Sequence, residues 1–365
     1  MKIKVRDSET GAPQTLDLHK NTITMRDESS GRMIEMDLGM PDVHLDRALA
    51  SYAAGYRFID FECIADEVAP VTLTPFASDK FFNWDKDDIL QDADDIIVGP
   101  GGTVKEITPR LSSAAFQTVS YGIGCFVPTE LQSNADSPLS LQQAATARCM
   151  TVLKQARERR ASNLLQLAGS WTGGYSVTLG ATAKWNSGSA SAPVQDIFAL
   201  QEGSLSPIKT LIMSEPVYHG YAANTNVQKF FVSKNNTPPL AGDATNGAQA
   251  QALADLLGVG KVLVSRRKGK TASGYGYIWG TSAVGVYNEP STPTNGQVIS
   301  TARTFRWNGA NGNVPDGTMV DGMMVRTYRD PSRGARGGQK VVVVHNDAEV
   351  MTSAFCGGLI VGAWQ

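Results

Sequence analysis

The sequence predicts a mixed α+β fold organised around one long helix. Three observations predict it. Residues 137–169 place apolar side chains at the three-and-four spacing that lines one face of an α-helix. Short helix and strand patterns alternate after residue 192. The 36 glycines and 17 prolines indicate many turns between extended segments.

Both ends of the long helix are marked in the sequence. Ser137 is an N-cap residue followed by proline, and Gly169 tolerates the left-handed conformation that ends a helix. At ~1.5 Å per residue the helix would be roughly 45 Å long, so it has to run across the molecule. Its polar interval, residues 154–160, includes Arg157 and Arg160. This interval is interpreted as a solvated face or, alternatively, as a surface that meets acidic groups of a neighbouring molecule.

The chain before the helix is predicted to be mostly extended. Within residues 1–64, only 43–52 show a short helical stripe. Prolines 70 and 75 in the segment 58–89 favour an edge ribbon. Residues 79–95 hold seven aspartates and two lysines, so they are expected to form an acidic projecting hairpin or loop.

The chain after the helix is predicted to form one α/β region and a long hairpin. Helices are expected from Pro193 to near Gly203, after Glu215 and at 248–257, with strands at 210–213, 261–265, 275–279 and 283–287. Two further strands, 322–328 and 340–345, are joined by the turn-rich loop 329–339. The terminal FCGGLIVGAW is expected to return as a strand to the α/β core.

Composition excludes several classes of protein. The net charge of −2 argues against a chain whose main role is to coat nucleic acid. Four widely spaced cysteines suggest neither a disulfide framework nor a zinc site. The N-terminus lacks an apolar signal segment, and no run approaches the ~18 apolar residues of a membrane span. Cytoplasmic synthesis without export is expected.

Motifs for catalysis are absent from the sequence. Residues 258–265 do not complete a phosphate loop, and neither a dinucleotide fingerprint nor a Gly-x-Ser-x-Gly nucleophile elbow is present. The histidines lack metal-ligand spacing, and the aspartates at 85–88 lack the glycine and glutamate of a calcium loop. Residues 304–307, TFRW, suit a half-buried strand better than stacking on a base. The sequence therefore predicts no catalytic residue, no cofactor and no metal.

What remains is segregated charge. Basic residues gather at 261–270 and at 326–340, whereas 79–95 is acidic. The acidic loop of one copy can pair with the basic hairpin of an identical copy, so these charges need no partner of another kind. The predicted contact residues between copies are Phe81, Phe82, Trp84, Asp85, Asp87, Asp88, Arg157, Arg160, Arg329, Arg333 and Arg336.

The order of these parts resembles that of tailed-bacteriophage major capsid proteins of the Hong Kong 97 fold. The resemblance covers residues 58–365 and is carried by FIDFECIADEVAPVTLTPFASDKFFNWDKDDI, YIWGTSAVGVYNEPSTPT, VRTYRDPSRGARGGQKVVVV and FCGGLIVGAW, in this order around the long helix. It implies the following divisions: an N-terminal arm (1–71), an extended β-hairpin loop (72–118), a peripheral domain (119–191) with spine helix 137–169, an axial domain (192–317), the peripheral-domain hairpin (318–350) and a return strand in the axial domain (351–365).

The resemblance also implies a function. Such a subunit assembles into pentamers and hexamers of an icosahedral shell that encloses double-stranded DNA, contacted without sequence specificity. The shell would be the virion capsid, assembled in the cytoplasm of a bacterial host, with no membrane partner. Portal, scaffolding and decoration proteins are further partners that the resemblance leaves open. The alternatives are the shell protein of an encapsulin-type bacterial nanocompartment and an unrelated α/β enzyme.

Overall fold

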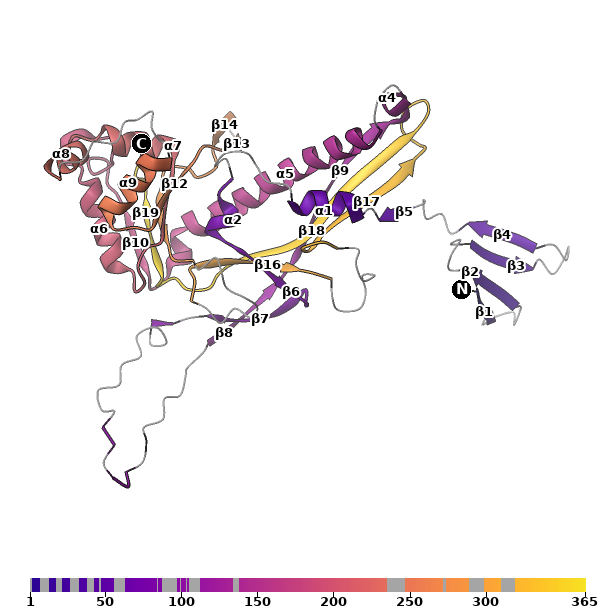
Figure 1. Ribbon diagram of the computed structural model, residues 1–365, viewed down its shortest axis with the longest axis horizontal. Coiled ribbons are helices and arrows are strands. Elements are labelled where there is room, and N and C mark those ends of the chain that lie inside the picture. Colours follow the sequence, from indigo (N-terminus) through magenta and orange to yellow (C-terminus); the bar gives the residue numbers. More distant parts are fainter. Residues whose placement is uncertain are drawn as a thin grey trace.

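A computed structural model gives the arrangement of most of the chain (Figure 1). It describes residues 2–6, 13–17, 22–26, 33–37, 43–45, 47–55, 63–83, 85–86, 97–98, 100–102, 104, 112–133, 138–234, 247–271, 274–288, 299–309 and 319–365.

The first four strands form an antiparallel sheet in the order β1-β2-β3-β4. They are β1 (Lys2–Arg6), β2 (Pro13–Asp17), β3 (Thr22–Arg26) and β4 (Met33–Asp37). The extended character of this region was predicted, but its pairing into a sheet was not. The stripe predicted at 43–52 divides into the strand β5 (Val43–Leu45) and the helix α1 (Arg47–Gly55).

The long helix α5 (Pro138–Gln166) has 29 residues and lies along a second sheet (Figure 1). This confirms the predicted helix, which ends three residues early because a 3₁₀ turn, Ala168–Trp171, follows it. The sheet has the order β5-β17-β18-β16-β6, and β9 also pairs with β18. Its other strands are β6 (Val71–Thr74), β9 (Val119–Pro128), β16 (Ala302–Trp307), β17 (Met323–Asp330) and β18 (Gly338–Met351).

Strands β17 and β18 form the predicted long hairpin, with Thr327 opposite Val341. The edge ribbon predicted at 58–89 is confirmed for β6, which lies at the sheet edge and pairs in parallel with β16. Just before it, the chain forms the short helix α2 (Ala65–Val68), which was not predicted. Strand β16 contains the TFRW motif, so its predicted place in a sheet is confirmed, but the first five residues of the strand are buried and not half-buried.

The α/β region contains a five-stranded sheet in the order β10-β19-β15-β11-β12. Its strands are β10 (Tyr175–Thr178), β11 (Thr210–Ser214), β12 (Lys261–Ser265), β15 (Ala283–Val286) and β19 (Gly357–Val361). Its helices are α6 (Pro193–Gly203), α7 (Glu215–Ala223), α8 (Thr225–Ser233) and α9 (Gly247–Leu257). The chain's last strand, β19, returns to this sheet between β10 and β15, as the sequence predicts.

Two small hairpins leave the body. The strands β7 (Ser78–Asn83) and β8 (Ser112–Gln117) pair on the far side of β16 from α5 (Figure 1). The strands β13 (Lys268–Thr271) and β14 (Gly274–Tyr277) pair near α5. A short helix, α4 (Thr129–Ser133), follows β9.

Helix α5 contributes to two separate hydrophobic cores. Its first half, through Met150 and Leu153, packs against Val341 and Val343 of β18. Its last turns, through Leu165, pack with Trp171 and Trp279 against the five-stranded sheet. The helix therefore joins the two sheets through packing at both of its ends. A third core lies between the five-stranded sheet and its helices.

We predict that Leu165→Ala destabilises the folded chain by about 2 to 5 kcal/mol, because it leaves a cavity in a core that relaxes only partially. Leu165 is fully buried, whereas Leu167, two residues later, is 61% exposed. Leu167→Ala is the matched control and should change stability by less than about 0.5 kcal/mol. Urea unfolding followed by circular dichroism measures both. Equal midpoints for the two variants would contradict the role of α5 in this core.

Candidate functional site at the junction of the long helix and the sheets

The middle of α5 carries a buried carboxylate. Glu158 has no exposed surface. It accepts hydrogen bonds from the backbone N–H of Ile64 at 3.1 Å and of Ala65 at 2.8 Å, and from the indole N–H of Trp279. Burial raises the pKa of Glu158, and these donors oppose the rise by favouring the charged form. One side chain thus links α5 to α2 and to the Trp279 segment.

Arg157, the preceding residue, is also buried. It pairs with the carboxylate of Asp66 and donates to the backbone oxygen of Ala69 at 2.8 Å and to the hydroxyl of Thr304 at 3.3 Å. Burial opposes ionisation of Asp66, but the charges of Arg157 and Lys154 outweigh it and lower the pKa of Asp66. These bonds hold α2 and the start of β6 against the helix.

Arg160 lies one turn further along and contacts β18. Its guanidinium donates to both carboxylate oxygens of Glu349, at 2.8 to 3.0 Å, in the bidentate geometry typical of strong arginine pairs. The same group lies 3.7 Å from the ring centroid of Tyr121 on β9. Arg160 therefore connects α5 to two neighbouring strands of one sheet.

A second buried ion pair joins β16 to β18. Arg306 donates to both oxygens of Asp347, at 2.6 and 2.8 Å. Burial opposes ionisation of Asp347, yet the hydrogen bonds and charge of Arg306 hold its pKa below the usual range. His345 Nε2 lies 3.2 Å from an oxygen of Asp347, although neither ring nitrogen of His345 makes a hydrogen bond of normal geometry. Burial and the nearby arginines lower the pKa of His345 to about 4.

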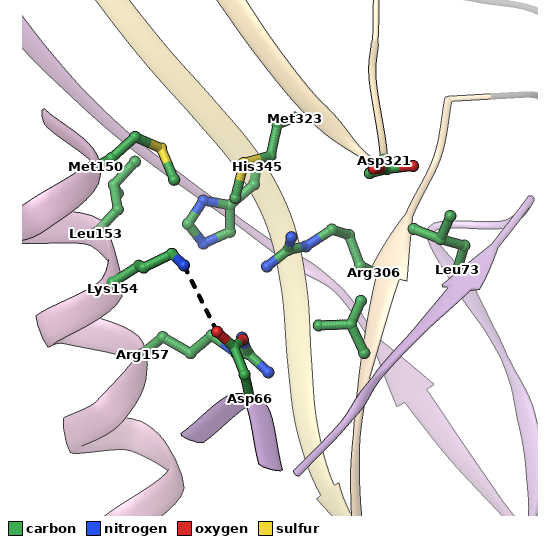
Figure 2. A pocket seen from close by; sticks show the side chains of 11 residues that line it. Asp66, Leu73, Met150, Leu153, Lys154, Arg157, Arg306, Asp321, Met323 and His345 are labelled. Carbon is green, nitrogen blue, oxygen red and sulfur yellow. Dashed lines mark hydrogen bonds and ion pairs between the residues drawn. The ribbon is translucent and has the colours of Figure 1, made fainter. Parts of the chain in front are cut away.

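Some of these groups line a cavity of about 380 Å³, namely Asp66, Lys154, Arg157, Arg306 and His345. Figure 2 shows Lys154 and Arg157 entering from α5, Asp66 from α2, and Arg306 and His345 from the sheet. Most of the charged groups around the cavity form ion pairs or hydrogen bonds with one another, so the arrangement fixes the helix to the sheet.

Within the described residues, no three His, Cys, Asp or Glu side chains gather as a metal site. None of the described helices is both long and apolar enough to cross a membrane.

Three of the predicted contact residues have partners inside the same chain. Arg157 and Arg160 do not form a solvated face, because acidic side chains of the same chain bind them, and their contact with a neighbour stays a prediction. Phe81 packs inside the subunit, 5.6 Å from Phe305 between ring centroids. Their partners come from segments far away in the sequence, and local pattern carries no signal for such pairing.

The other predicted contact residues lie on projecting parts or outside the described residues. Arg329, Arg333 and Arg336 are exposed at the tip of the β17–β18 hairpin. In the extended loop, Asp85 is exposed and Phe82 is half-buried. Trp84, Asp87 and Asp88 lie outside the described residues. That these side chains meet a second copy stays a prediction.

Sequence reasoning missed Asp66, Glu158, Arg306, His345, Asp347 and Glu349. A signal was present for some of them. In β18 a histidine and two acids stand among valines, at a place where a strand packed against a helix is expected to be apolar. Charged residues in a buried strand imply partners inside the fold.

Comparison with known proteins identifies the fold. No family model matches the sequence, and no curated protein matches it. A phage-related protein from Bordetella bronchiseptica RB50 has 16% sequence identity and a TM-score of 0.67, over 87% of this chain and 97% of that chain. The capsid of cyanophage P-SCSP1u has 11% identity and a TM-score of 0.48, over 84% and 91% of the two chains. The virus-like particle from Pyrococcus furiosus has 11% identity and a TM-score of 0.46, over 87% and 97%.

The fold assignment rests on the first of these likenesses. The chain shares almost the whole architecture of the phage-related protein. It has a mixed α+β fold of the Hong Kong 97 type, as the sequence predicts.

We predict that acid destabilises the folded chain through His345. Its pKa is 6.5 when unfolded and about 4 when folded, so between these values the unfolded chain binds more protons. Stability is then complete above pH 6.5 and falls by up to about 3 kcal/mol as the pH drops to 4. Asp66 and Asp347, whose folded pKa values are lowered from 3.8, lose their contributions only at lower pH.

The test compares the wild type with His345→Gln by chemical unfolding at several pH values. The variant should be less sensitive to pH between 6.5 and 4, whatever its stability at neutral pH. Parallel pH profiles would show that His345 is not protonated on unfolding in this range.

Proposed function

We propose that the chain is a major capsid protein of a tailed bacteriophage, the subunit of an icosahedral shell that encloses double-stranded DNA. The observation that carries the proposal is the fold shared with a phage-related protein over 97% of that protein's length. The order of sequence motifs around α5 supports it independently. In this role the chain acts by geometry and self-association, without a catalytic step, a cofactor or a metal.

Exposed apolar side chains on the projecting loop support self-association. Ile97 is 92% exposed and Val104 is 75% exposed, and both belong to the segment between β7 and β8. Phe76 and Val119 are also exposed at the base of this loop. Burying such apolar groups lowers the free energy of the protein. In a symmetric assembly, a second copy of the same chain can bury them.

The arrangement of contacts follows from this proposal. Copies join as hexamers and pentamers, with the extended loop and the hairpin tip reaching neighbours while α5 keeps each subunit rigid. Packaged DNA is contacted through its phosphates, without sequence readout. Portal, scaffolding and decoration proteins are the further partners that such a shell uses. Assembly takes place in the cytoplasm of the bacterial host, and the product is the virion capsid.

We predict that the purified chain, or the chain expressed alone in bacteria, forms closed shells of uniform diameter. Negative-stain electron microscopy measures this directly. A chain that stays monomeric under all conditions tested would overturn the proposal. Shells that enclose a protein cargo and exclude DNA in the native host would instead favour a bacterial nanocompartment. An enzyme of unrelated function would leave no shells at all.

We predict that reversing the charge of the acidic loop blocks assembly but not folding. Changing Asp85, Asp87 and Asp88 together to lysine should give subunits that have normal circular dichroism and melting temperature but do not assemble into closed shells. Exposed ion pairs contribute only ~0 to 1 kcal/mol each, but a shell repeats every contact in each subunit.

The design includes a rescue and a matched control. Adding Arg333→Glu and Arg336→Glu should restore part of the assembly if the two surfaces face each other. Glu202→Lys with Asp255→Lys, at exposed positions of the α/β region, should have little effect. Normal assembly of the triple lysine variant at both low and high salt would refute the electrostatic role of the loop.

A further inference from the structure

The small hairpin β13–β14 has two unlike faces. Its register pairs Lys268 with Tyr277 and Lys270 with Tyr275, and residues directly opposite in an antiparallel pair point to the same face. The intervening pair, Gly269 opposite Gly276, therefore belongs to the other face. One face is basic and aromatic, and the other is built largely of glycine.

The glycine face lies on α5. A Cβ atom added at Gly269 would stand 2.6 Å from a guanidinium nitrogen of Arg159 and 3.2 Å from the side chain of Ile278, so a larger residue does not fit there. Arg159 donates to the backbone oxygen of Lys270 at 3.3 Å, and the amide of Gln155 donates to that of Lys268 at 3.2 Å. The hairpin is thus fixed to the exposed side of the helix in a defined orientation.

The other face displays cations and an aromatic ring to solvent. Lys268 and Lys270 are exposed, and Tyr275 is 86% exposed. Tyr277 is less available to a ligand, because its hydroxyl donates a hydrogen bond to Glu215 at 2.7 Å. Glu215 also faces Arg266 at 3.6 Å. Among the described residues, no acidic side chain forms an ion pair with either lysine.

The arginines exposed on α5 belong to a different surface. Arg159 lies against the glycine face of the hairpin, and Arg148 lies about three turns before it on the helix. We define the hairpin surface as Lys268, Lys270 and Tyr275.

We propose that the hairpin surface binds the phosphate backbone of double-stranded DNA. This inference rests on the proposed function, which supplies DNA as the polyanion inside the shell, and it adds the place of contact. Stable protein interfaces have an apolar centre that is depleted in charge, whereas DNA-binding surfaces are polar and strongly positive. The hairpin surface contains two cations, a tyrosine hydroxyl and no aliphatic residue. Lysine, arginine and tyrosine are all donors to phosphate oxygens, and such contacts carry no sequence preference.

The experiment measures binding of unassembled subunits to a short DNA duplex of mixed sequence, by fluorescence anisotropy over a series of NaCl concentrations. The logarithm of the affinity should fall linearly with the logarithm of the salt concentration. In Lys268→Ala with Lys270→Ala, the slope should become shallower by about 2, roughly one for each lysine removed from a phosphate. Tyr275→Phe should weaken binding without changing the slope, because it removes a donor but no charge.

The matched control is Lys229→Ala with Lys234→Ala. It removes two exposed lysines at helix α8, away from the hairpin surface, and should leave both affinity and slope unchanged. Melting temperatures of all variants report whether the fold is intact. A second duplex of different sequence should bind equally well.

Four outcomes bear on the proposal. An unchanged slope in the hairpin double variant, or the same change in the control variant, overturns it. If the hairpin double variant binds DNA normally but fails to form closed shells, the proposal is also overturned. The hairpin surface is then assigned to contact with a second copy of the chain. Failure of the wild type to form shells, with salt-dependent binding through the hairpin surface intact, would refute the capsid function while leaving the DNA contact standing.

Discussion

The buried carboxylate of Glu158 is the interaction on which the rest of the structure depends. A carboxylate taken out of water costs several kcal/mol unless hydrogen bonds replace its hydration. Glu158 finds its donors at Ile64, Ala65 and Trp279, which belong to two separate segments of the chain. Shifting or rotating α5 would leave the buried carboxylate without hydrogen-bond donors. The position of the helix relative to both sheets is therefore fixed by a polar constraint in addition to apolar packing.

This constraint acts together with apolar packing at both ends of α5. Met150 anchors the first half of α5 to one core, and Leu165 anchors its end to another. Between them, Arg157 and Arg160 bind acids of α2 and β18. The helix uses its central charges internally. Under the proposed function, contacts with other copies then fall to the projecting loop and the hairpin tip.

Local signals in the sequence were sufficient for many elements and insufficient for the junction. Strand β12 (Lys261–Ser265) and helix α6 (Pro193–Gly203) have the predicted bounds, because short apolar runs and proline at a helix start are local features. The ion pair of Arg160 with Glu349 depends on a fold that brings together residues 189 positions apart.

The sequence does contain a signal for the N-terminal sheet. Strands β1 and β3 begin 20 residues apart, at Lys2 and Thr22, and so do β2 and β4, at Pro13 and Met33. Such a repeat indicates two similar hairpins.

The most direct test of a rigid subunit joined through its projecting parts is a cryo-electron microscopy reconstruction of the assembled particle at side-chain resolution. The account predicts that every symmetry-independent subunit keeps Glu158 hydrogen-bonded to Trp279, and keeps Arg160 paired with its own Glu349. It also predicts that neighbouring copies meet at the segment between β7 and β8 and at the β17–β18 tip. Subunits whose central arginines leave their own acids to pair with a neighbour would contradict it.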